Sequence, residues 1–204
     1  MLVDAGANSD CKPNNLLEFG IMGKIYMEKV IGRENPKVGL VNIGAEASKG
    51  STLTKAAYEL LEQSKMNFIG NVEAREVPEG ACDVIVTDGF TGNVLLKLTE
   101  GMALNILKLL KKKFTEGTKA KLGAALLIDK IRDIKQDFDY SEYGGAPILG
   151  VRGPIVKMHG SSNANAVKNT IIKGIPYAEE KVVDIIQNSV LEIEEITLSE
   201  HDRF

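Results

Sequence analysis

The chain carries Val86-Thr87-Asp88-Gly89-Phe90-Thr91-Gly92-Asn93 at the end of an apolar run that starts at Ala81. A long helical pattern follows from Val94, so the sequence predicts a turn from a strand into a helix. The first amides of a helix lack partners within the helix and lie at the positive end of its dipole. A turn of this kind therefore suits an oxyanion or a phosphate.

A second turn has the same character. His159-Gly160-Ser161-Ser162-Asn163 follows the apolar run Ile155–Met158 and precedes another helical pattern. In this turn we expect Ser161 and Ser162 to be the residues that cap the helix, since hydroxyl side chains favour that position. Two turns suited to anions on one chain predict one small-molecule site.

Short apolar runs alternate with helical patterns along the chain. The runs are typical of strands that are buried on both faces of a parallel sheet. The predicted strands are Leu2–Asp4, Val38–Ile43, Asn67–Gly70, Val84–Thr87, Ile148–Val151 and Ile155–Met158. The helical patterns include one that starts at Pro13, one with a stripe from Leu53 to Leu61, and one that follows a break at Gly174–Pro176. This alternation predicts an α/β fold, a three-layer, doubly wound, mostly parallel sheet in a single domain of residues 1–204.

Ligands of such sheets bind beyond the carboxyl ends of the strands. The loops expected at that edge are rich in glycine and small polar residues. They are Gly6–Asn8, Gly44–Gly50, Asn71–Glu73, Thr87–Asn93 and His159–Asn163. The sequence therefore concentrates its polar chemistry where the predicted fold places a site.

The composition is that of a soluble globular protein, with 44% hydrophobic and 26% charged residues. A net charge of −3 argues against a general nucleic-acid binder. No apolar run approaches the roughly 20 residues that cross a bilayer, and no secretion signal is evident, so we expect a cytoplasmic location. Cys11 and Cys82 lack the spacing of metal ligands, and two histidines are too few for a histidine-based site. We expect no metal and no cofactor.

Four side chains in the predicted loops carry chemistry, and each has a structural alternative. Lys49 adds a positive charge to an anion held by N–H groups, or is an exposed loop lysine. Asn93 donates an amide hydrogen to an oxyanion, or caps the helix from Val94. Asp88 caps backbone amides or orients Lys49. His159 acts as a general acid or hydrogen-bond donor, or is structural.

The sequence contains no Gly-x-Ser-x-Gly turn and no Walker loop. It therefore presents no obvious covalent nucleophile. If the protein transfers an acyl group, direct attack by a bound second substrate is favoured over an acyl-enzyme.

A basic segment precedes an apolar one. Residues 97 to 121 carry seven lysines against Glu100 and Glu116. Lys108, Lys111, Lys112 and Lys113 crowd the predicted end of a helix, where cations oppose the negative end of the dipole. The segment from Leu122 to Tyr140 follows, with Leu126, Leu127 and Ile128 among its apolar residues. Such a pair of segments also suits an anionic bilayer or an acidic partner protein.

These motifs resemble the bacterial phosphate acyltransferase family known as PlsX, the fatty acid/phospholipid synthesis proteins. The resemblance spans nearly the whole chain in the order of the family. It rests on Leu2-Val3-Asp4-Ala5-Gly6-Ala7-Asn8, Asn42-Ile43-Gly44, Lys49-Gly50, Leu53-Thr54-Lys55, Asn67 to Ala74, Val86 to Asn93, Glu142-Tyr143-Gly144-Gly145-Ala146 and His159-Gly160-Ser161-Ser162.

The resemblance implies transfer of a long-chain acyl group from acyl carrier protein to inorganic phosphate, which gives acyl phosphate for phospholipid synthesis. It further implies a fold like the isocitrate/isopropylmalate dehydrogenases, a homodimer, peripheral membrane association and a possible downstream membrane acyltransferase as partner. By the same resemblance, Lys49 and Asn93 are catalytic, and the basic and apolar segments from about Leu98 to Tyr140 contact the membrane or the carrier protein. The implied phosphate-binding residues are Asp88, Gly89, Thr91, Gly92, His159, Ser161, Ser162 and Asn163.

Compared with that family, the chain is expected to lack an N-terminal part, and Ala45-Glu46-Ala47-Ser48 differs from the residues expected before the Lys-Gly pair. Other functions stay open. One is a short-chain phosphate acyltransferase, and another is a non-catalytic fragment that binds a membrane or the carrier protein. A decarboxylating dehydrogenase needs clustered metal-binding aspartates and a nucleotide site, which the sequence does not show.

Overall fold

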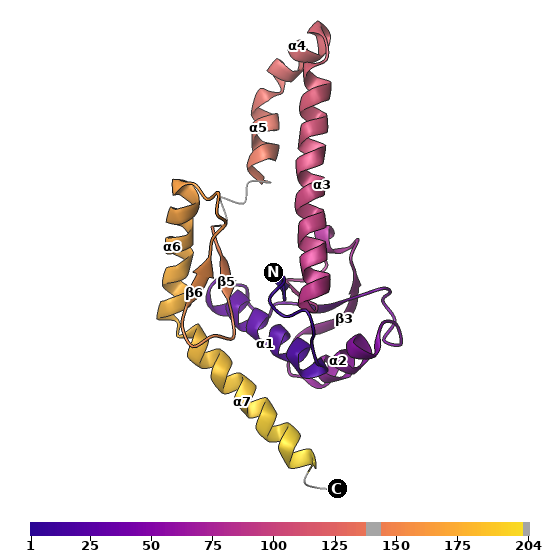
Figure 1. Cartoon of the computed structure of the whole chain (residues 1–204), viewed down its shortest axis with the longest axis vertical. Coiled ribbons are helices and arrows are strands. Elements are labelled where there is room, and N and C mark those ends of the chain that lie inside the picture. The colour runs from indigo at the N-terminus through magenta and orange to yellow at the C-terminus, as the bar shows by residue number, and fades with distance from the viewer. Residues whose placement is uncertain (138–143, 202–204) are drawn as a thin grey trace.

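The computed structural model describes residues 1–137 and 144–201. Its strands are β1 (Leu2–Val3), β2 (Val38–Asn42), β3 (Phe68–Glu73), β4 (Val84–Val86), β5 (Ala146–Ile148) and β6 (Ile155–Lys157). Its helices are α1 (Pro13–Lys29), α2 (Thr52–Gln63), α3 (Gly89–Thr115), α4 (Thr118–Leu126), α5 (Ile128–Asp137), α6 (Ala164–Glu179) and α7 (Val182–His201), with a short 3₁₀ helix at Val77–Glu79. Figure 1 shows their arrangement.

The first four strands form one parallel sheet in the order β1-β4-β2-β3. All residues of the two central strands, β2 and β4, are buried. Continuous apolar runs predict such strands because a parallel sheet is covered on both faces. The predicted α/β class and parallel sheet are confirmed, and β3 extends beyond its predicted end at Gly70 to Glu73.

Helices α1 and α2 pack against each other and against this sheet. Proline at the first position of α1 is tolerated because the first amide of a helix has no partner within it. Leu16 of α1 and Leu61 of α2 are fully buried together with Leu40 of β2. This core holds the four strands, and thus their carboxyl ends, in fixed positions.

Strands β5 and β6 form a separate antiparallel sheet. The prediction that runs 148–151 and 155–158 belong to the parallel sheet is therefore wrong, and the first of these strands lies two residues earlier, at Ala146–Ile148. Only six residues connect the strands. A parallel connection needs a crossover of about a dozen or more residues, so a link this short leaves a hairpin as the outcome.

The predicted helix break at Gly174–Pro176 is also wrong. Helix α6 runs through Pro176 to Glu179, and the chain turns at Lys181, whose φ is 50°. Tyr177 holds this last turn in place. Its ring packs edge-on against Tyr26 of α1 with centroids 5.6 Å apart, and its hydroxyl donates to the Ile148 carbonyl at 3.1 Å.

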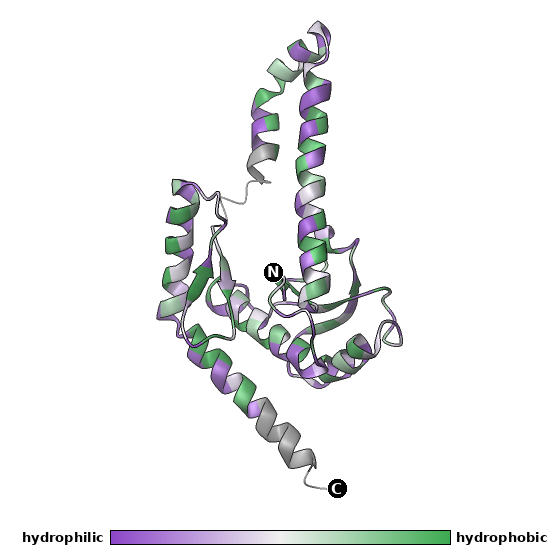
Figure 2. Cartoon of the chain, viewed as in Figure 1, coloured by the Kyte–Doolittle hydropathy of each residue, from purple (hydrophilic) through white to green (hydrophobic). Residues whose placement is uncertain are grey.

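Helices α3, α4 and α5 project from the sheet (Figure 1). Figure 2 shows polar and apolar residues alternating along α3 as far as its end. Many of its apolar side chains are exposed, including Leu98, Met102, Leu104, Ile106 and Leu109. Among the described residues, no helix combines the length and hydropathy required to cross a membrane. The end of the predicted segment, from Phe138 to Tyr140, and Glu142 and Tyr143 of the family-like motif lie outside the described residues.

Candidate functional site

The turn after β4 is tighter than the sequence predicts. Helix α3 begins at Gly89, so Thr91, Gly92 and Asn93 lie within its first turns instead of before them. Asp88 is the N-cap. Its Oδ1 accepts the Thr91 amide hydrogen and its Oδ2 accepts the Thr91 hydroxyl, each at 2.8 Å. The predicted capping role of Asp88 is confirmed.

Three of the first four amides of α3 are already engaged. The Gly89 amide donates to the Asn8 carbonyl at 2.8 Å, the Thr91 amide to Asp88, and the Gly92 amide to the Asp88 carbonyl at 2.9 Å. The Asp88 carboxylate also places a negative charge at the positive end of the helix dipole. The expectation of free amides for a phosphate is therefore wrong for Gly89, Thr91 and Gly92. The Gly89 amide attaches the helix to the loop after β1, and the Thr91 and Gly92 amides bind the N-cap residue Asp88.

Gly92 makes this attachment close. A Cβ atom at this position would lie 1.8 Å from the Asp4 carbonyl oxygen. Only glycine lets the helix backbone approach the end of β1 at this distance, since any other side chain begins with that atom. Gly92 is therefore required for the packing of α3 against the end of β1.

The loop after β1 is organised by a buried carboxylate. Asp4 is 7% exposed, and its oxygens accept the amide hydrogens of Gly6, Ala7 and Asn8 at 2.6–2.9 Å, together with Asn8 Nδ2 at 3.0 Å. Burial alone raises the pKa of Asp4, but the hydrogen bonds from Ala7, Gly6 and Asn8 outweigh it and leave the pKa below its ordinary value. The ionised carboxylate thus holds the loop that receives the Gly89 amide.

Asn93 lies beside this loop. An ideal Cβ on Gly6 would lie 3.3 Å from both Cβ and Oδ1 of Asn93, so the asparagine side chain rests against the backbone of Gly6. Asn93 is exposed, and because Asp88 caps α3, the alternative that Asn93 is the cap is wrong. Its amide is presented at the carboxyl edge of the sheet.

Lys49 follows the neighbouring central strand. Its side chain is exposed, and its backbone is held at both ends, since the Lys49 amide donates to the Glu46 carbonyl at 3.0 Å and the Lys49 carbonyl accepts from Asn42 Nδ2 at 3.1 Å. Within the described parts of the chain, Lys49 forms no ion pair, so the alternative that Asp88 orients it is not supported. Strands β2 and β4 are adjacent, and the structure thereby brings Lys49 and Asn93 to one edge.

The His159–Asn163 turn belongs to the other sheet, because it follows β6. Asn163 is the N-cap of α6 and accepts the Ala166 amide hydrogen at 2.9 Å, so the prediction that Ser161 or Ser162 is the cap is wrong. Ser161 pairs with His159 instead. Its Oγ lies 2.6 Å from His159 Nδ1, which also accepts the Ser161 amide hydrogen at 3.2 Å. The Ser162 amide donates to the His159 carbonyl at 3.0 Å.

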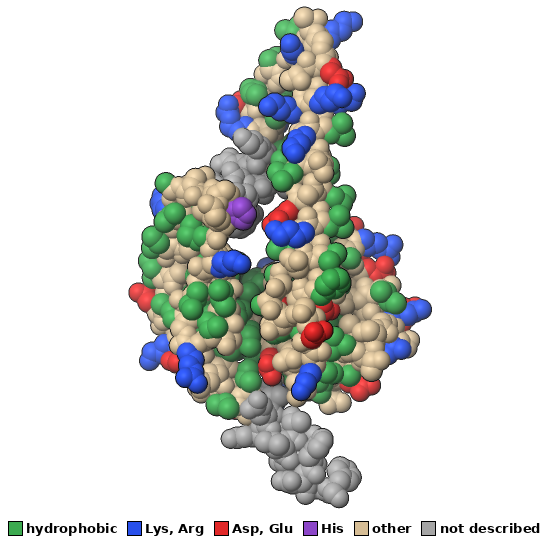
Figure 3. Space-filling model, viewed as in Figure 1, with side chains coloured by type: hydrophobic (Ala, Val, Ile, Leu, Met, Phe, Trp, Pro, Cys, Tyr) green, Lys and Arg blue, Asp and Glu red, His purple; other side chains and the backbone are tan. Residues whose placement is uncertain are grey.

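The two predicted turns therefore do not share a sheet edge. Figure 3 shows the surface hollowed between α3 and the part of the molecule formed by β5, β6 and α6. A ligand that contacts both turns would lie across this hollow.

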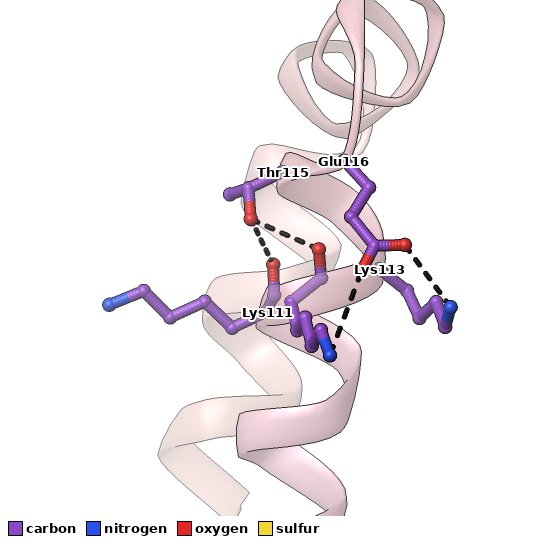
Figure 4. A network of polar contacts seen from close by, with 5 residues as sticks. Lys111, Lys113, Thr115 and Glu116 are labelled. Atoms are coloured by element: carbon purple, nitrogen blue, oxygen red, sulfur yellow. Dashed lines mark hydrogen bonds and ion pairs between the residues drawn. The ribbon is translucent and has the colours of Figure 1, made fainter.

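The predicted contact residues for a membrane or carrier protein lie on the projection. Figure 4 shows the end of α3, where Glu116 pairs with Lys113 at 3.1 Å and with Lys112 at 4.0 Å. Lys108 and Lys111 form no ion pair with any described residue. Leu126, at the end of α4, is 88% exposed. Leu127 and Ile128, at the junction of α4 and α5, are about half exposed.

Four residues with structural roles at the site were not predicted as site residues. Asp4 and Asn8 organise the loop after β1, and Asn42 and Asn71 bind the loop that carries Lys49. Asp4 and Asn42 are polar residues that directly follow an apolar run, and this pattern is a signal by which the sequence marks them. Among the described residues, no group of three or more acidic, histidine or cysteine side chains is arranged to hold a metal ion.

The fold and this edge define an α/β protein whose parallel sheet presents a lysine, an asparagine and glycine-rich loops beyond its strands. The family model described as "Fatty acid synthesis protein" matches residues 1–184. The chain belongs to this family, and the resemblance seen in the sequence is confirmed.

Three similar proteins carry the name phosphate acyltransferase. The chain is 56% identical over 190 residues to the phosphate acyltransferase of Alkaliphilus oremlandii (strain OhILAs), 52% over 193 residues to that of Clostridium acetobutylicum, and 50% over 202 residues to that of Clostridioides difficile (strain 630). These alignments cover 93%, 95% and 99% of the chain but 57%, 58% and 59% of the relatives. The chain thus spans less than two thirds of the length of the relatives it matches.

Proposed function

We propose that the chain takes part in the transfer of a long-chain acyl group from acyl carrier protein to inorganic phosphate. The observation that carries the proposal is that Lys49 and Asn93 follow adjacent strands of one parallel sheet, Lys49 on the loop after β2 and Asn93 in the first turns of α3 after β4. The names of the relatives support the reaction class, since they are phosphate acyltransferases. The proposal includes the fold of the isocitrate/isopropylmalate dehydrogenases, in which the ligand lies beyond the carboxyl ends of the strands.

Lys49 is proposed to bind the phosphate. Millimolar binding requires about 4 kcal/mol. A helix N-terminus contributes about 0.3–1 kcal/mol, and up to about 2 when partly buried. The start of α3 already holds the Asp88 carboxylate, so its dipole is in part compensated. A side-chain cation is therefore needed, and Lys49 supplies one without a competing ion pair among the described residues.

Asn93 is proposed to stabilise the transition state. A phosphate oxygen attacks the thioester carbonyl carbon, a C–O bond forms, and the carbonyl oxygen becomes an oxyanion. The Asn93 amide donates a hydrogen bond to that oxyanion. When the tetrahedral intermediate collapses, the C–S bond breaks, the carrier leaves as a thiolate that takes up the proton released by hydrogen phosphate, and acyl phosphate remains.

The remaining assignments follow from the same proposal. His159, Ser161, Ser162 and Asn163 would contact the substrates from the opposite side of the hollow. The projection of α3, α4 and α5 would contact the carrier protein or an anionic membrane surface, with a homodimer as the assembly and a downstream membrane acyltransferase as a possible partner.

A hydroxylamine trap for acyl phosphate tests the reaction. We expect phosphate-dependent product from long-chain acyl carrier protein, and we expect Lys49→Ala and Asn93→Ala each to lower turnover by roughly 100-fold or more. Acetyl-coenzyme A in place of the acyl carrier protein tests the short-chain alternative. Wild-type turnover in both variants contradicts the assigned roles.

A second candidate function is non-catalytic binding. It is favoured by the row of exposed apolar residues and lysines along the projection. Binding to anionic vesicles or to acyl carrier protein by a chain that forms no acyl phosphate would support this candidate over the first.

A further inference from the structure

Two asparagines are buried where β2 and β3 approach the candidate site. Asn42 is 9% exposed and Asn71 is 8% exposed. Because Leu40 of β2 is opposite Asn71 of β3, Asn42 lies two residues further along on the same face of the sheet. The two side chains meet there, and Asn42 Nδ2 donates to Asn71 Oδ1 at 3.1 Å.

Asn42 Oδ1 accepts the amide hydrogen of the next residue, Ile43, at 2.9 Å. The other hydrogen bonds of this pair go to the loop that carries Lys49. Asn42 Nδ2 donates to the Lys49 carbonyl at 3.1 Å, and Asn71 Nδ2 donates to the Glu46 carbonyl at 2.8 Å. The Lys49 amide donates to the same Glu46 carbonyl. The loop is thus attached at two carbonyl groups, one of them that of Lys49 itself.

Gly50 confirms how close this attachment is. Its φ is 99°, and a Cβ atom at this position would lie 2.4 Å from Asn42 Oδ1. A side chain here would displace the asparagine or the loop. The aliphatic part of the Lys49 side chain packs close to the backbone of Gly44, since a Cβ added to Gly44 would lie 3.3 Å from Lys49 Cγ. The exposed ammonium group therefore extends from a backbone that is fixed on both sides.

Burial of two amides is costly unless their hydrogen bonds are made. The strands β2 and β3 pair through their own backbones, so this register does not require the pair. We propose that Asn42 and Asn71 are positioning residues that hold Lys49 in place for the phosphate. This inference rests on the proposed function, in which Lys49 binds that anion, and small displacements of such a group are expensive for a reaction.

The test compares two asparagines of the same strand region. Asn71→Leu removes the bonds to the Glu46 carbonyl and to Asn42 Nδ2 at nearly constant size and adds no charge. Asn67→Leu is the matched control, because Asn67 Nδ2 donates to the Asn35 carbonyl at 3.1 Å next to the opposite end of β3. Three readouts are measured: calorimetric titration of the chain with inorganic phosphate, hydrogen exchange of residues 44–50, and the kinetic constants in the hydroxylamine assay.

We expect Asn71→Leu to raise the Kd for phosphate by about tenfold, which corresponds to about 1.4 kcal/mol. We also expect faster exchange in residues 44–50, and a kcat lower by up to roughly 100-fold. The control is expected to stay within about twofold of the wild type in each readout. Should Asn71→Leu fail to fold, Asn71→Ser replaces it, since its hydroxyl is too short to reach the Glu46 carbonyl.

Lys49→Ala separates this inference from the proposed function. If Lys49→Ala weakens phosphate binding while Asn71→Leu keeps the Kd and the loop exchange of the wild type, the positioning role is overturned and the proposed function stands. If Lys49→Ala binds phosphate as the wild type does, the role of the lysine is overturned, and the positioning role with it. A wild-type chain that binds no phosphate overturns both.

Discussion

The first and last turns of α3 belong to one helix of 27 residues but lie in different surroundings. At its start, Gly89 and Gly92 are buried, and the Asp88 cap, the Asn8 carbonyl and the end of β1 surround the backbone. Towards its end, Leu104 and Leu109 are more than half exposed. The polar contacts there are local, such as the ion pair of Lys113 with Glu116 and the bonds of the Thr115 hydroxyl to the Lys111 and Lys112 carbonyls. Tertiary packing holds the first region, whereas the second depends on helix propensity and local pairs.

The largest effect expected from this contrast is that of a methyl group added to the helix start. Gly92→Ala places a Cβ where the Asp4 carbonyl oxygen lies, so we expect a loss of about 3 kcal/mol or more in the free energy of unfolding. Gly101→Ala is the control from the exposed part of the same helix, where an added Cβ meets no atom within 4 Å apart from the neighbouring backbone of the helix. It should stabilise the chain by up to about 1 kcal/mol. Equal effects in urea denaturation would contradict the contrast.

A smaller effect is expected for the carboxylate under the helix start. Asp4→Asn removes the ionised acceptor of the amides of Gly6, Ala7 and Asn8, and we expect a loss of about 1.5–3 kcal/mol at neutral pH. Because the pKa of Asp4 is lowered in the folded chain, its stabilisation is fully present above its ordinary value of 3.8. It is lost as the pH falls through the lowered pKa.

Unfolding free energies of the wild type and Asp4→Asn between pH 7 and pH 3 measure this dependence. The difference between the two chains should be constant down to about pH 4 and shrink below it. Asp10→Asn, an exposed neighbour in the same segment, is the control and should show no such difference. A gap between wild type and Asp4→Asn that widens on acidification is the contrary result.

The smallest effect on stability is expected at the projection. Leu126 is 88% exposed, so Leu126→Ser should change the free energy of unfolding by less than about 0.5 kcal/mol. If the end of α4 contacts a bilayer, as proposed, the same change should weaken sedimentation with anionic vesicles by roughly tenfold, since about 1.5–3 kcal/mol accompanies burial of a leucine. Ile31→Ser, at a half-exposed residue after α1 and outside the projection, is the control and should leave vesicle binding unchanged. Unchanged vesicle binding in Leu126→Ser removes Leu126 from the proposed contact.

The sequence predicts correctly those elements that have both a clear apolar pattern and a clear boundary residue. The buried runs before Asn42 and Thr87 predict β2 and β4, and Pro13 marks the start of α1 correctly. The hairpin of β5 and β6 was missed because its strands have the same apolar character as those of the parallel sheet. The connection of six residues between them is too short for a parallel arrangement.

At the site, the sequence predicts which loops are polar but not which hydrogen bonds they make. Glycines and hydroxyls before a helix suggest free amides, yet Asn8, more than 80 residues away in the chain from Gly89, accepts one of them. The link between Asn71 and Glu46 also joins residues far apart in the chain. Such contacts depend on the strand order β1-β4-β2-β3, which local patterns do not contain.

Helix α3 is a rod of roughly 40 Å, given a rise of about 1.5 Å per residue. One end is anchored beside Asn93, and the other carries Lys111 and Lys113 far from the sheet. A partner bound at the far end would apply its force about 40 Å from the close contact between Gly92 and Asp4, which fixes the start of the helix. A small tilt of the helix at this contact therefore moves the far end by a much larger distance. A force on the far end likewise acts as a torque on the first turn of α3.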